Sequence, residues 1–231
     1  MNATNSPGNI SAAEELISTG LQKTADKKVG MACSFSVEDL VVINLLRKIA
    51  PEVVIFAIDT GRLHEETYEV AEALRQKYNL HIDWYLPQTE TLQKLEREKG
   101  LFSFRENIEN RLECCHIRKV EPLNRALTGL EGWVTGQRRA QSTTRSRLKG
   151  IEVDDAHGGI IKINPLLTWS DEQVWAYATD HRLPVNRLHR QGYPSIGCAP
   201  CTREVESGED TRAGRWWWEN PEHKECGLHR R

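Results

Sequence analysis

Short apolar runs alternate with amphipathic stretches along the first hundred residues. The apolar runs have the length of buried strands and lie at 27–35, 53–58 and 80–85. The amphipathic stretches repeat their apolar positions with a helical period and lie at 37–50, 63–78 and 90–99. This β-α-β-α-β-α order predicts an α/β fold with a mainly parallel sheet and helices on both faces, because crossover helices join parallel strands. Ligands of such sheets bind at the carboxyl ends of the strands, which here lie near Ser34 and Asp59.

Beyond residue 100 the pattern is less regular. It predicts a helical stretch, a further strand, a β-hairpin and a capped helix, at 107–127, 133–135, 151–153 with 160–163, and 170–181. From Pro184 onward the periodicity is lost, and Pro, Gly and charged residues indicate an ordered loop followed by a mobile tail. We therefore expect an α/β domain at 1–202 and a C-terminal tail at 203–231.

Composition narrows the class of protein. The 231 residues are 39% hydrophobic and carry a formal net charge of −2, so bulk attraction to nucleic acid or to an anionic membrane is not expected. No run approaches the roughly 20 apolar residues of a membrane span, and the first twenty residues contain no signal-peptide core. We expect a cytoplasmic protein, whose six cysteines are metal ligands or reactive groups rather than disulfides.

The layout of the cysteines is the clearest chemical signal. Cys114 and Cys115 are adjacent, and Cys198 and Cys201 form a Cys-x-x-Cys. Adjacent residues on a helix point about 100° apart, so a vicinal pair is poorly placed to bind one tetrahedral zinc ion, whereas a cubane offers a separate iron to each thiolate. Four thiolates therefore indicate an iron–sulfur cluster, with Cys226 left over.

Three polar segments follow predicted strands. Ser34-Phe35-Ser36 lies between a strand and a helix, where hydroxyls and helical N–H groups face a bound anion. Taken alone, the serines are explained somewhat better by ordinary helix capping. The Asp59–Arg62 segment ends the next strand. A glycine followed by Arg138 and Arg139 suits bidentate contacts to phosphate or sulfate, or forms a surface basic patch.

Seven segments occur together and in order along residues 30–231: IDTGRLHEETY, ECCHIRKVEPL, TGQRRAQSTTR, INPLLTWSDEQVW, GYPSIGCAPCT, GEDTRAGRWWWE and ECGLH. With them the chain resembles the assimilatory adenylyl-sulfate (APS) reductases of the bacterial iron–sulfur type, within the PAPS/APS reductase family. One segment alone would be weak, but seven in order are specific.

The resemblance implies an adenine-nucleotide-hydrolase-like (PP-loop, Rossmann-like) fold with one [4Fe-4S] cluster bound by Cys114, Cys115, Cys198 and Cys201. It implies that Cys226, in the ECGLH tail, is the catalytic nucleophile. The implied activity is thioredoxin-dependent reduction of APS to sulfite and AMP through an enzyme S-sulfocysteine, in assimilatory sulfate reduction and cysteine biosynthesis. The alternative is a reductase of PAPS or of both nucleotides, and a homo-oligomer is left open.

We expect a set of substrate-binding residues from the loops, the arginine pair and the cationic second half of the chain: Ser34, Ser36, Asp59, Thr60, Gly61, Arg62, Lys119, Arg138, Arg139, Arg212, Arg215 and His229. The Ser36–Asp39 segment departs from the family's usual pattern because it has no glycine. Cys33 matches no ligand or nucleophile of the family, and packing is its expected role.

Two other classes compete with this interpretation. A metal-containing nucleic-acid binder would use the basic 137–149 stretch but leaves Cys226 unexplained. An ATP-dependent tRNA-thiolating enzyme would share the strand–loop–helix phosphate site, but its SGGxDS loop is absent.

Overall fold

A computed structural model of the chain describes residues 7–24, 27–141 and 145–220. By its internal contacts the chain divides into two interleaved units. Unit 1 comprises Met1–Ala57, Val70–Asp83 and Gly129–Asn186, and unit 2 comprises Ile58–Glu69, Trp84–Thr128 and Arg187–Arg231. Each unit is described by itself. The expected division at residue 202 stays a prediction.

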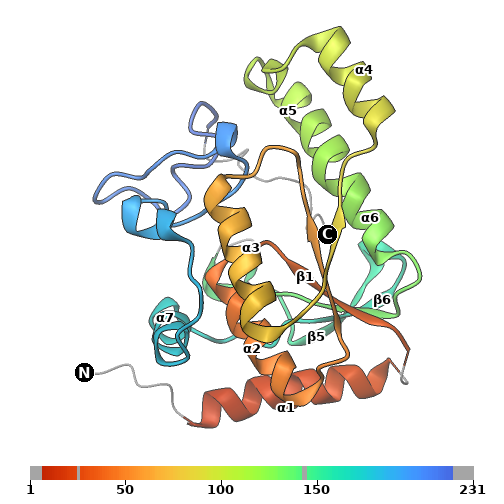
Figure 1. The fold of residues 1–231 in the computed structure, drawn as a ribbon, viewed down its shortest axis with the longest axis vertical. Coiled ribbons are helices and arrows are strands. Elements are labelled where there is room, and N and C mark those ends of the chain that lie inside the picture. The colour runs from red at the N-terminus through yellow and green to blue at the C-terminus, as the bar shows by residue number, and fades with distance from the viewer. Residues whose placement is uncertain (1–6, 25–26, 142–144, 221–231) are drawn as a thin grey trace. The chain divides into compact units, whose positions relative to one another are not determined.

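The sheet has six strands in the order β3-β2-β1-β4-β6-β5 (Figure 1). Their bounds are β1 Val29–Cys33, β2 Val54–Ile58, β3 Ile82–Tyr85, β4 Gly132–Val134, β5 Ile151–Asp154 and β6 Ile160–Ile163. β1 pairs in parallel with β2 and β4, and β4 pairs in parallel with β6. Only β5, which forms the predicted hairpin with β6, is antiparallel among the described pairings. The predicted α/β class with a mainly parallel sheet is confirmed.

The core of unit 1 is a continuous set of buried apolar side chains. Helix α2 (Val37–Ile49) contributes a long run of them, including the fully buried Leu40 and Ile43. Helix α7 (Asp171–Asp180) packs on α2 and begins with the predicted cap, in which Ser170 and Gln173 form a reciprocal capping box. The fully buried Tyr177 joins α7 to the same core.

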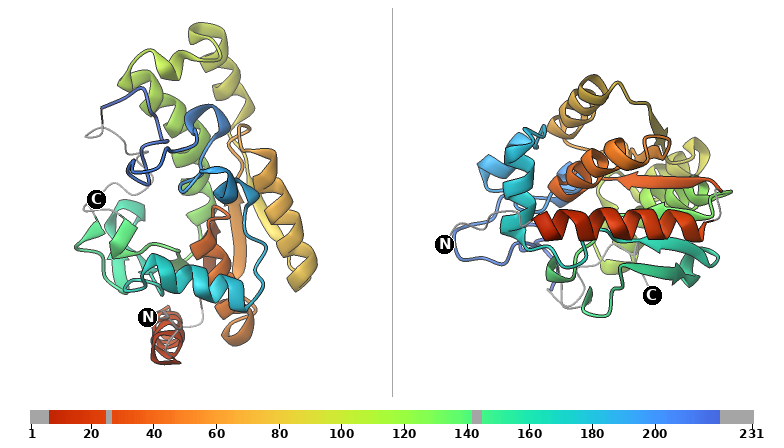
Figure 2. Two further views of the ribbon diagram at one scale, coloured as in Figure 1. Left: turned by 90° about the vertical axis from the view of Figure 1, so that its left-hand side faces the viewer. Right: turned by 90° about the horizontal axis from the view of Figure 1, so that it is seen from below.

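Helix α1 (Pro7–Lys23) was not predicted from the sequence. It crosses the bottom of Figure 1 and contacts α2 and β6, and Figure 2 shows it nearly end-on in the left view and along its length in the view from below. Ala13 and Ile17 are its buried contacts with the core. These positions, together with the half-buried Ile10, have helical spacing, so a periodic signal was present in the sequence.

The regular structure of unit 2 is mainly helical. Its helices are α4 (Thr89–Lys99), α5 (Ile108–Cys115) and α6 (Glu121–Leu127), and α3 (Glu65–Tyr78) begins in it. The helical stretch predicted at 107–127 is confirmed, but its middle, His116–Val120, is a π-helix. No described helix is long and apolar enough to cross a bilayer.

The C-terminal part of unit 2 is irregular, as predicted, with short 3₁₀ turns at Arg187–Gln191 and Ala199–Cys201. Part of the expected tail is packed: an isolated bridge pairs Thr202 with Arg215, and Trp216 is 1% exposed, whereas residues 206–211 are exposed. The rest of the expected tail, residues 221–231, lies outside the described residues.

Candidate functional site

The residues expected to act on substrate occur in both units. Cys226 and His229 lie outside the described residues, so their roles stay predictions.

In unit 1, Asp39 organises the loop between β1 and α2. The backbone N–H and the hydroxyl of Ser34 both donate to Oδ2 of Asp39, each at 2.7 Å. Ser36 is the N-cap of α2, and its hydroxyl accepts from the N–H of Asp39 at 3.4 Å. The non-glycine residue between the serines, Phe35, has a φ of 62° and is buried. Ser36 is therefore a helix cap, as one of the two interpretations predicted. Ser34 already donates its hydrogen bonds to an anion, the carboxylate of Asp39.

The pKa of the Asp39 carboxyl group lies close to neutral pH. Burial raises its pKa from 3.8 to about 6, against the hydrogen bonds from Ser34, which favour the charged form, and nearby Glu38 raises it further. This loop therefore holds a carboxylate whose charge changes just below physiological pH, at the strand end where the sequence predicted anion binding.

Arg138 is a buried member of an ion-pair network in unit 1. Its guanidinium donates to Oε1 of Glu38 at 2.7 and 3.1 Å, to the carbonyl of Trp169 at 3.0 Å, and to Asp171. Arg138 lowers the pKa of Glu38, although burial of that carboxyl opposes the shift. Its neighbour Arg139 is exposed and donates to the carbonyl of Leu148. Anion binding by this arginine pair stays a prediction, and for Arg138 it requires exchange of existing partners.

Close packing at the end of β4 requires Gly136. A Cβ at this position would lie 2.5 Å from Oδ1 of Asp39 and 3.0 Å from Cβ of Glu38. The next residue, Gln137, is 6% exposed, and its Nε2 has no hydrogen-bond partner among the described residues. A buried amide donor without a partner is costly, so Nε2 of Gln137 is available to a water or to a polar ligand atom. Sequence reasoning missed Gln137, although it lies within the TGQRR segment.

In unit 2, the loop after β2 is fixed by its own side chains. Oδ1 of Asp59 accepts from the N–H of Gly61 at 2.8 Å and from the hydroxyl of Tyr68 at 2.9 Å. Gly61 has a φ of 68°, in the left-handed region that favours glycine. Thr60 is buried, and its Oγ1 accepts from the thiol of Cys198 at 3.3 Å. The loop thus connects directly to the Cys-x-x-Cys segment.

The two cysteine pairs are held on different local structures of unit 2. Cys114 and Cys115 end α5, immediately before the π-helix, and Cys198 and Cys201 flank a 3₁₀ turn. π-helical turns inside helices are frequent at functional sites. None of the cysteines in the described residues is in a disulfide.

The four thiols lie close enough to influence one another. Burial is the largest cause that raises the pKa of Cys201 to about 12, and Cys198, Cys115 and Cys114 raise it further. Burial also raises the pKa of Cys114, with a further contribution from Cys198. Both cysteine pairs therefore lie in one region of unit 2, as predicted.

Cationic groups face these thiols. Burial opposes ionisation of Cys198, yet its pKa is lowered, because Lys119 is nearby and hydrogen-bonds it, and Thr60 and Arg215 favour the thiolate as well. Arg62 and Arg118 act in the same direction on Cys114. Among these thiols the cations lower the pKa of Cys198, whereas burial keeps that of Cys114 and of Cys201 raised.

The arginines around this group differ in their environment. Arg118, which the sequence analysis did not select, is 4% exposed and donates to the carbonyl of Thr60 at 2.6 Å and to Glu96 at 2.6 Å. Arg62 donates to the carbonyl of Leu101 at 2.7 Å. The signal for Arg118 was its position between the cysteine pair and Lys119 in ECCHIRKVEPL.

Arg215 is buried and Arg212 lies in an exposed turn. The N–H of Arg212 donates to Asp210 at 2.8 Å. The guanidinium of Arg215 lies 4.8 Å from the ring centroid of Trp216 and would be only 2.4 Å from a Cβ on Gly197. A side chain at position 197 would therefore displace the guanidinium of Arg215 from its present place beside the cysteine loop.

The thiol group suits a cluster better than a single metal ion. Among the described residues, no three His, Cys, Asp or Glu side chains are placed to hold one ion. A cubane binds each cysteine through a different iron, so its ligands need not converge on one point. Four neighbouring thiols with cations beside them fit such a group.

Comparison with known proteins agrees with this chemistry. The family model "Phosphoadenosine phosphosulfate reductase domain" matches residues 28–204. A protein of Allochromatium vinosum named adenosine 5'-phosphosulfate reductase is 48% identical over 225 residues, covering 97% of this chain and 87% of that protein. A protein of the same name from Burkholderia cepacia is 50% identical over 202 residues, covering 87% and 80%.

Solved structures show the same fold. The phosphoadenylyl-sulfate (PAPS) reductase of Candida auris, in a phosphate complex, matches with a TM-score of 0.70 and 28% identity, covering 84% of this chain and 90% of that one. The FMN adenylyltransferase of Candida glabrata matches with a TM-score of 0.60 at 16% identity, covering 94% and 76%, which shows the fold alone. The chain belongs to the phosphoadenosine phosphosulfate reductase family.

Proposed function

We propose that this protein reduces APS to sulfite and AMP in assimilatory sulfate reduction. The observation that carries the proposal is the gathering of four thiols with Lys119 in unit 2 of a chain whose relatives, at 48% and 50% identity, are named adenosine 5'-phosphosulfate reductase. The proposal makes the chain an oxidoreductase of the cytoplasm, with its product passing to cysteine biosynthesis.

In the first half-reaction, the thiolate of Cys226 attacks the sulfur of APS. A bond forms between Sγ and that sulfur, the bond from sulfur to the phosphate oxygen breaks, and AMP leaves with the electron pair. The thiol proton goes to solvent or a base, and Cys226 becomes an S-sulfocysteine. Charge accumulates on the departing phosphate, so cations near it lower the barrier. Lys119, Arg212, Arg215 and His229 are our candidates.

We propose that Cys114, Cys115, Cys198 and Cys201 bind one [4Fe-4S] cluster. When bound, the cluster supplies a fixed charged centre, and no electron from it is needed because thiols provide both. The chain's own part is electrostatic: Lys119 and Arg215 favour the thiolate of Cys198, and Arg62 and Arg118 favour that of Cys114. Lys119, by its bond to Cys198, is positioned to couple ligand charge to substrate binding.

The second half-reaction needs a dithiol, for which we propose thioredoxin. Its thiolate attacks Sγ of Cys226, the bond from Sγ to the sulfonate sulfur breaks, and sulfite leaves with the electron pair. The partner's second thiol then resolves the mixed disulfide, which regenerates Cys226 and leaves the partner oxidised by two electrons.

The alternative substrate is PAPS, alone or together with APS. It is supported by the family's description and by the Candida auris relative. Single-turnover rates with each nucleotide measure the preference directly, and a rate with PAPS above that with APS would reverse our assignment.

The deciding experiment weighs the intact protein after incubation with APS and no reductant. We expect a gain of one SO₃ in the wild type and in Cys33→Ala, because Cys33 is a buried packing residue. We expect no gain in Cys226→Ser. If wild-type protein binds APS but gains no mass, covalent catalysis by Cys226 is wrong.

Cluster binding is tested separately by metal analysis. Anaerobically purified protein should be brown and contain close to four irons per chain, and Cys201→Ser should lose most of that iron while Cys33→Ala keeps it. Stoichiometric zinc without iron would refute the cluster.

A further inference from the structure

Unit 2 exposes an aromatic patch, which we define as Leu101, Phe102, Arg105, Trp217 and Trp218. Leu101, Phe102 and Trp217 are 55%, 57% and 38% exposed. The guanidinium carbon of Arg105 lies 5.3 to 5.7 Å from the ring centroids of Phe102, Trp217 and Trp218. Large exposed apolar groups cost free energy in a monomer, and a cluster of them marks an interaction site.

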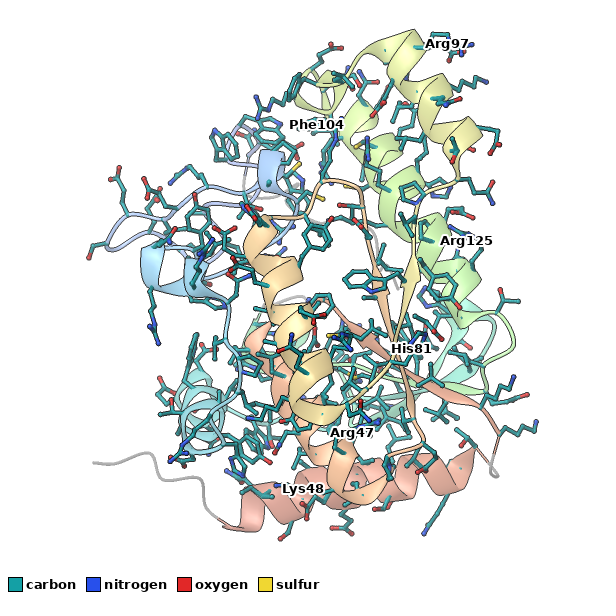
Figure 3. The ribbon with its side chains drawn as sticks, in the orientation of Figure 1. Arg47, Lys48, His81, Arg97, Phe104 and Arg125 are labelled. Atoms are coloured by element: carbon teal, nitrogen blue, oxygen red, sulfur yellow. The ribbon has the colours of Figure 1, made fainter. Side chains whose placement is uncertain are left out.

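The patch is built on rigid supports. Phe104, labelled in Figure 3 near α5, is 1% exposed, and its ring lies 6.1 Å from Phe102 and 5.9 Å from Trp218. Arg105 donates to the carbonyl of Pro200, between Cys198 and Cys201. The patch is thus fixed to the same loop that carries the second cysteine pair.

The chain is anchored at the edge of the patch. Glu219 forms a buried, bidentate ion pair with Arg111 at 2.9 Å, with side-chain exposures of 5% and 1%. Trp216 is held between Arg111 and Arg215, each 4.8 Å from its ring centroid. Cys226 is the seventh residue after Glu219, and a chain spans at most roughly 3.6 Å per residue. Whatever the conformation of those residues, Cys226 stays within about 25 Å of the anchor.

The short segment between Glu219 and Cys226 limits where a protein partner can bind. A partner must place a thiol on Sγ of Cys226, so it must bind within the distance from Glu219 that this segment can span. Trp, Phe and Arg side chains are enriched at the centres of protein interfaces. The end of the chain itself, PEHKECGLHRR, has five charged residues among its eleven and offers only Pro221 and Leu228 as larger apolar groups, so it matches the patch poorly.

We infer that the aromatic patch is the docking surface for the protein dithiol that reduces the S-sulfocysteine. The inference rests on the proposed function, and it adds the location of the contact. The partner it fits is a small protein whose reactive thiol is surrounded by an apolar surface, because such a surface can cover Leu101, Phe102 and Trp217 while its thiol meets Cys226.

The test uses the full chain with two exposed patch residues changed, Leu101→Ser with Phe102→Ser. The matched control is Val153→Ser, whose side chain is 57% exposed on β5 of unit 1. Three rates are compared: sulfonation of Cys226 by APS without reductant, sulfite release by dithiothreitol, and sulfite release by thioredoxin.

We expect the patch variant to match the wild type in the first two rates and to raise the KM for thioredoxin at least about fivefold. The control should match the wild type in all three. An unchanged KM overturns the docking surface, as does an equal rise in Val153→Ser.

Loss of sulfonation in the patch variant alone assigns the patch to the substrate step instead. A wild-type dimer that the patch variant dissociates in solution assigns it to contacts between copies of this chain. If the wild type itself is not sulfonated, the proposed function fails, and thioredoxin binding, measured directly, still tests the patch.

Discussion

Asp39 shows what a single buried carboxyl group does to this protein. It accepts both donors of Ser34 and lies against Gly136, while its pKa is raised from 3.8 to about 6 chiefly by burial. At a pH between 3.8 and about 6, Asp39 is protonated in the folded protein but ionised in the unfolded chain. The cost of burying the charged form is therefore absent below pH 3.8 and complete above about pH 6.

We predict that Asp39→Asn flattens the pH dependence of stability. The free energy of unfolding of the wild type, minus that of the variant, should fall by up to about 3 kcal/mol as pH rises from 4 to 6.5, because one pKa unit is worth about 1.4 kcal/mol. Urea denaturation at several pH values measures this difference. Asp180→Asn, at an exposed site, should follow the wild type; a constant difference between wild type and Asp39→Asn would contradict the raised pKa.

At the scale of elements, α1 and the end of α5 depend on packing as well as on local sequence. The face of α1 that meets the core consists of only a few apolar positions, so its helix is stabilised chiefly by contacts with α2 and β6. In α5 the sequence predicted a helix through both cysteines, but the ladder widens into a π-helix directly after them. Which turn of a helix widens depends on the partners around it and not on periodicity.

We predict that Ile17→Ala lowers the free energy of unfolding by 2 to 5 kcal/mol, roughly, because a fully buried side chain is lost and a cavity remains. Chemical denaturation followed by circular dichroism measures the change. Glu15→Ala, on the exposed face of the same helix, should have little effect. Equal effects of the two substitutions would mean that α1 does not pack on the core as described.

At the scale of the whole chain, ion pairs join segments that are distant in sequence. Within unit 1, Arg138 meets Glu38, and within unit 2, Arg111 meets Glu219. Both pairs are buried, and removal of one partner leaves an uncompensated charge in a poorly solvated place. These contacts decide where the arginine pair of TGQRR and the segment before ECGLH lie.

We predict that Glu219→Gln destabilises the protein by about 3 kcal/mol, because the guanidinium of Arg111 stays buried without its carboxylate. Thermal unfolding of the cluster-free protein measures the change without interference from iron. Glu72→Gln breaks the exposed pair with Arg75 on α3 and should leave the melting temperature unchanged. A similar shift for both variants would contradict a special role for burial.

The sequence alone determined the order of the strands and α-helices from β1 to α7, the mainly parallel sheet and the family, and it predicts the separation of the cysteines into four plus Cys226 and Cys33. These follow from periodicity and from residues close in the chain, whose chemistry is local. It did not determine that Ser34 serves Asp39, that Arg138 is occupied by Glu38, or that Gln137 is a buried donor without a partner among the described residues. It also did not reveal Arg111, Arg118 or the aromatic patch. Those properties depend on contacts between residues up to about a hundred positions apart, and burial, which sets both pKa and partner choice, exists only once the chain has folded.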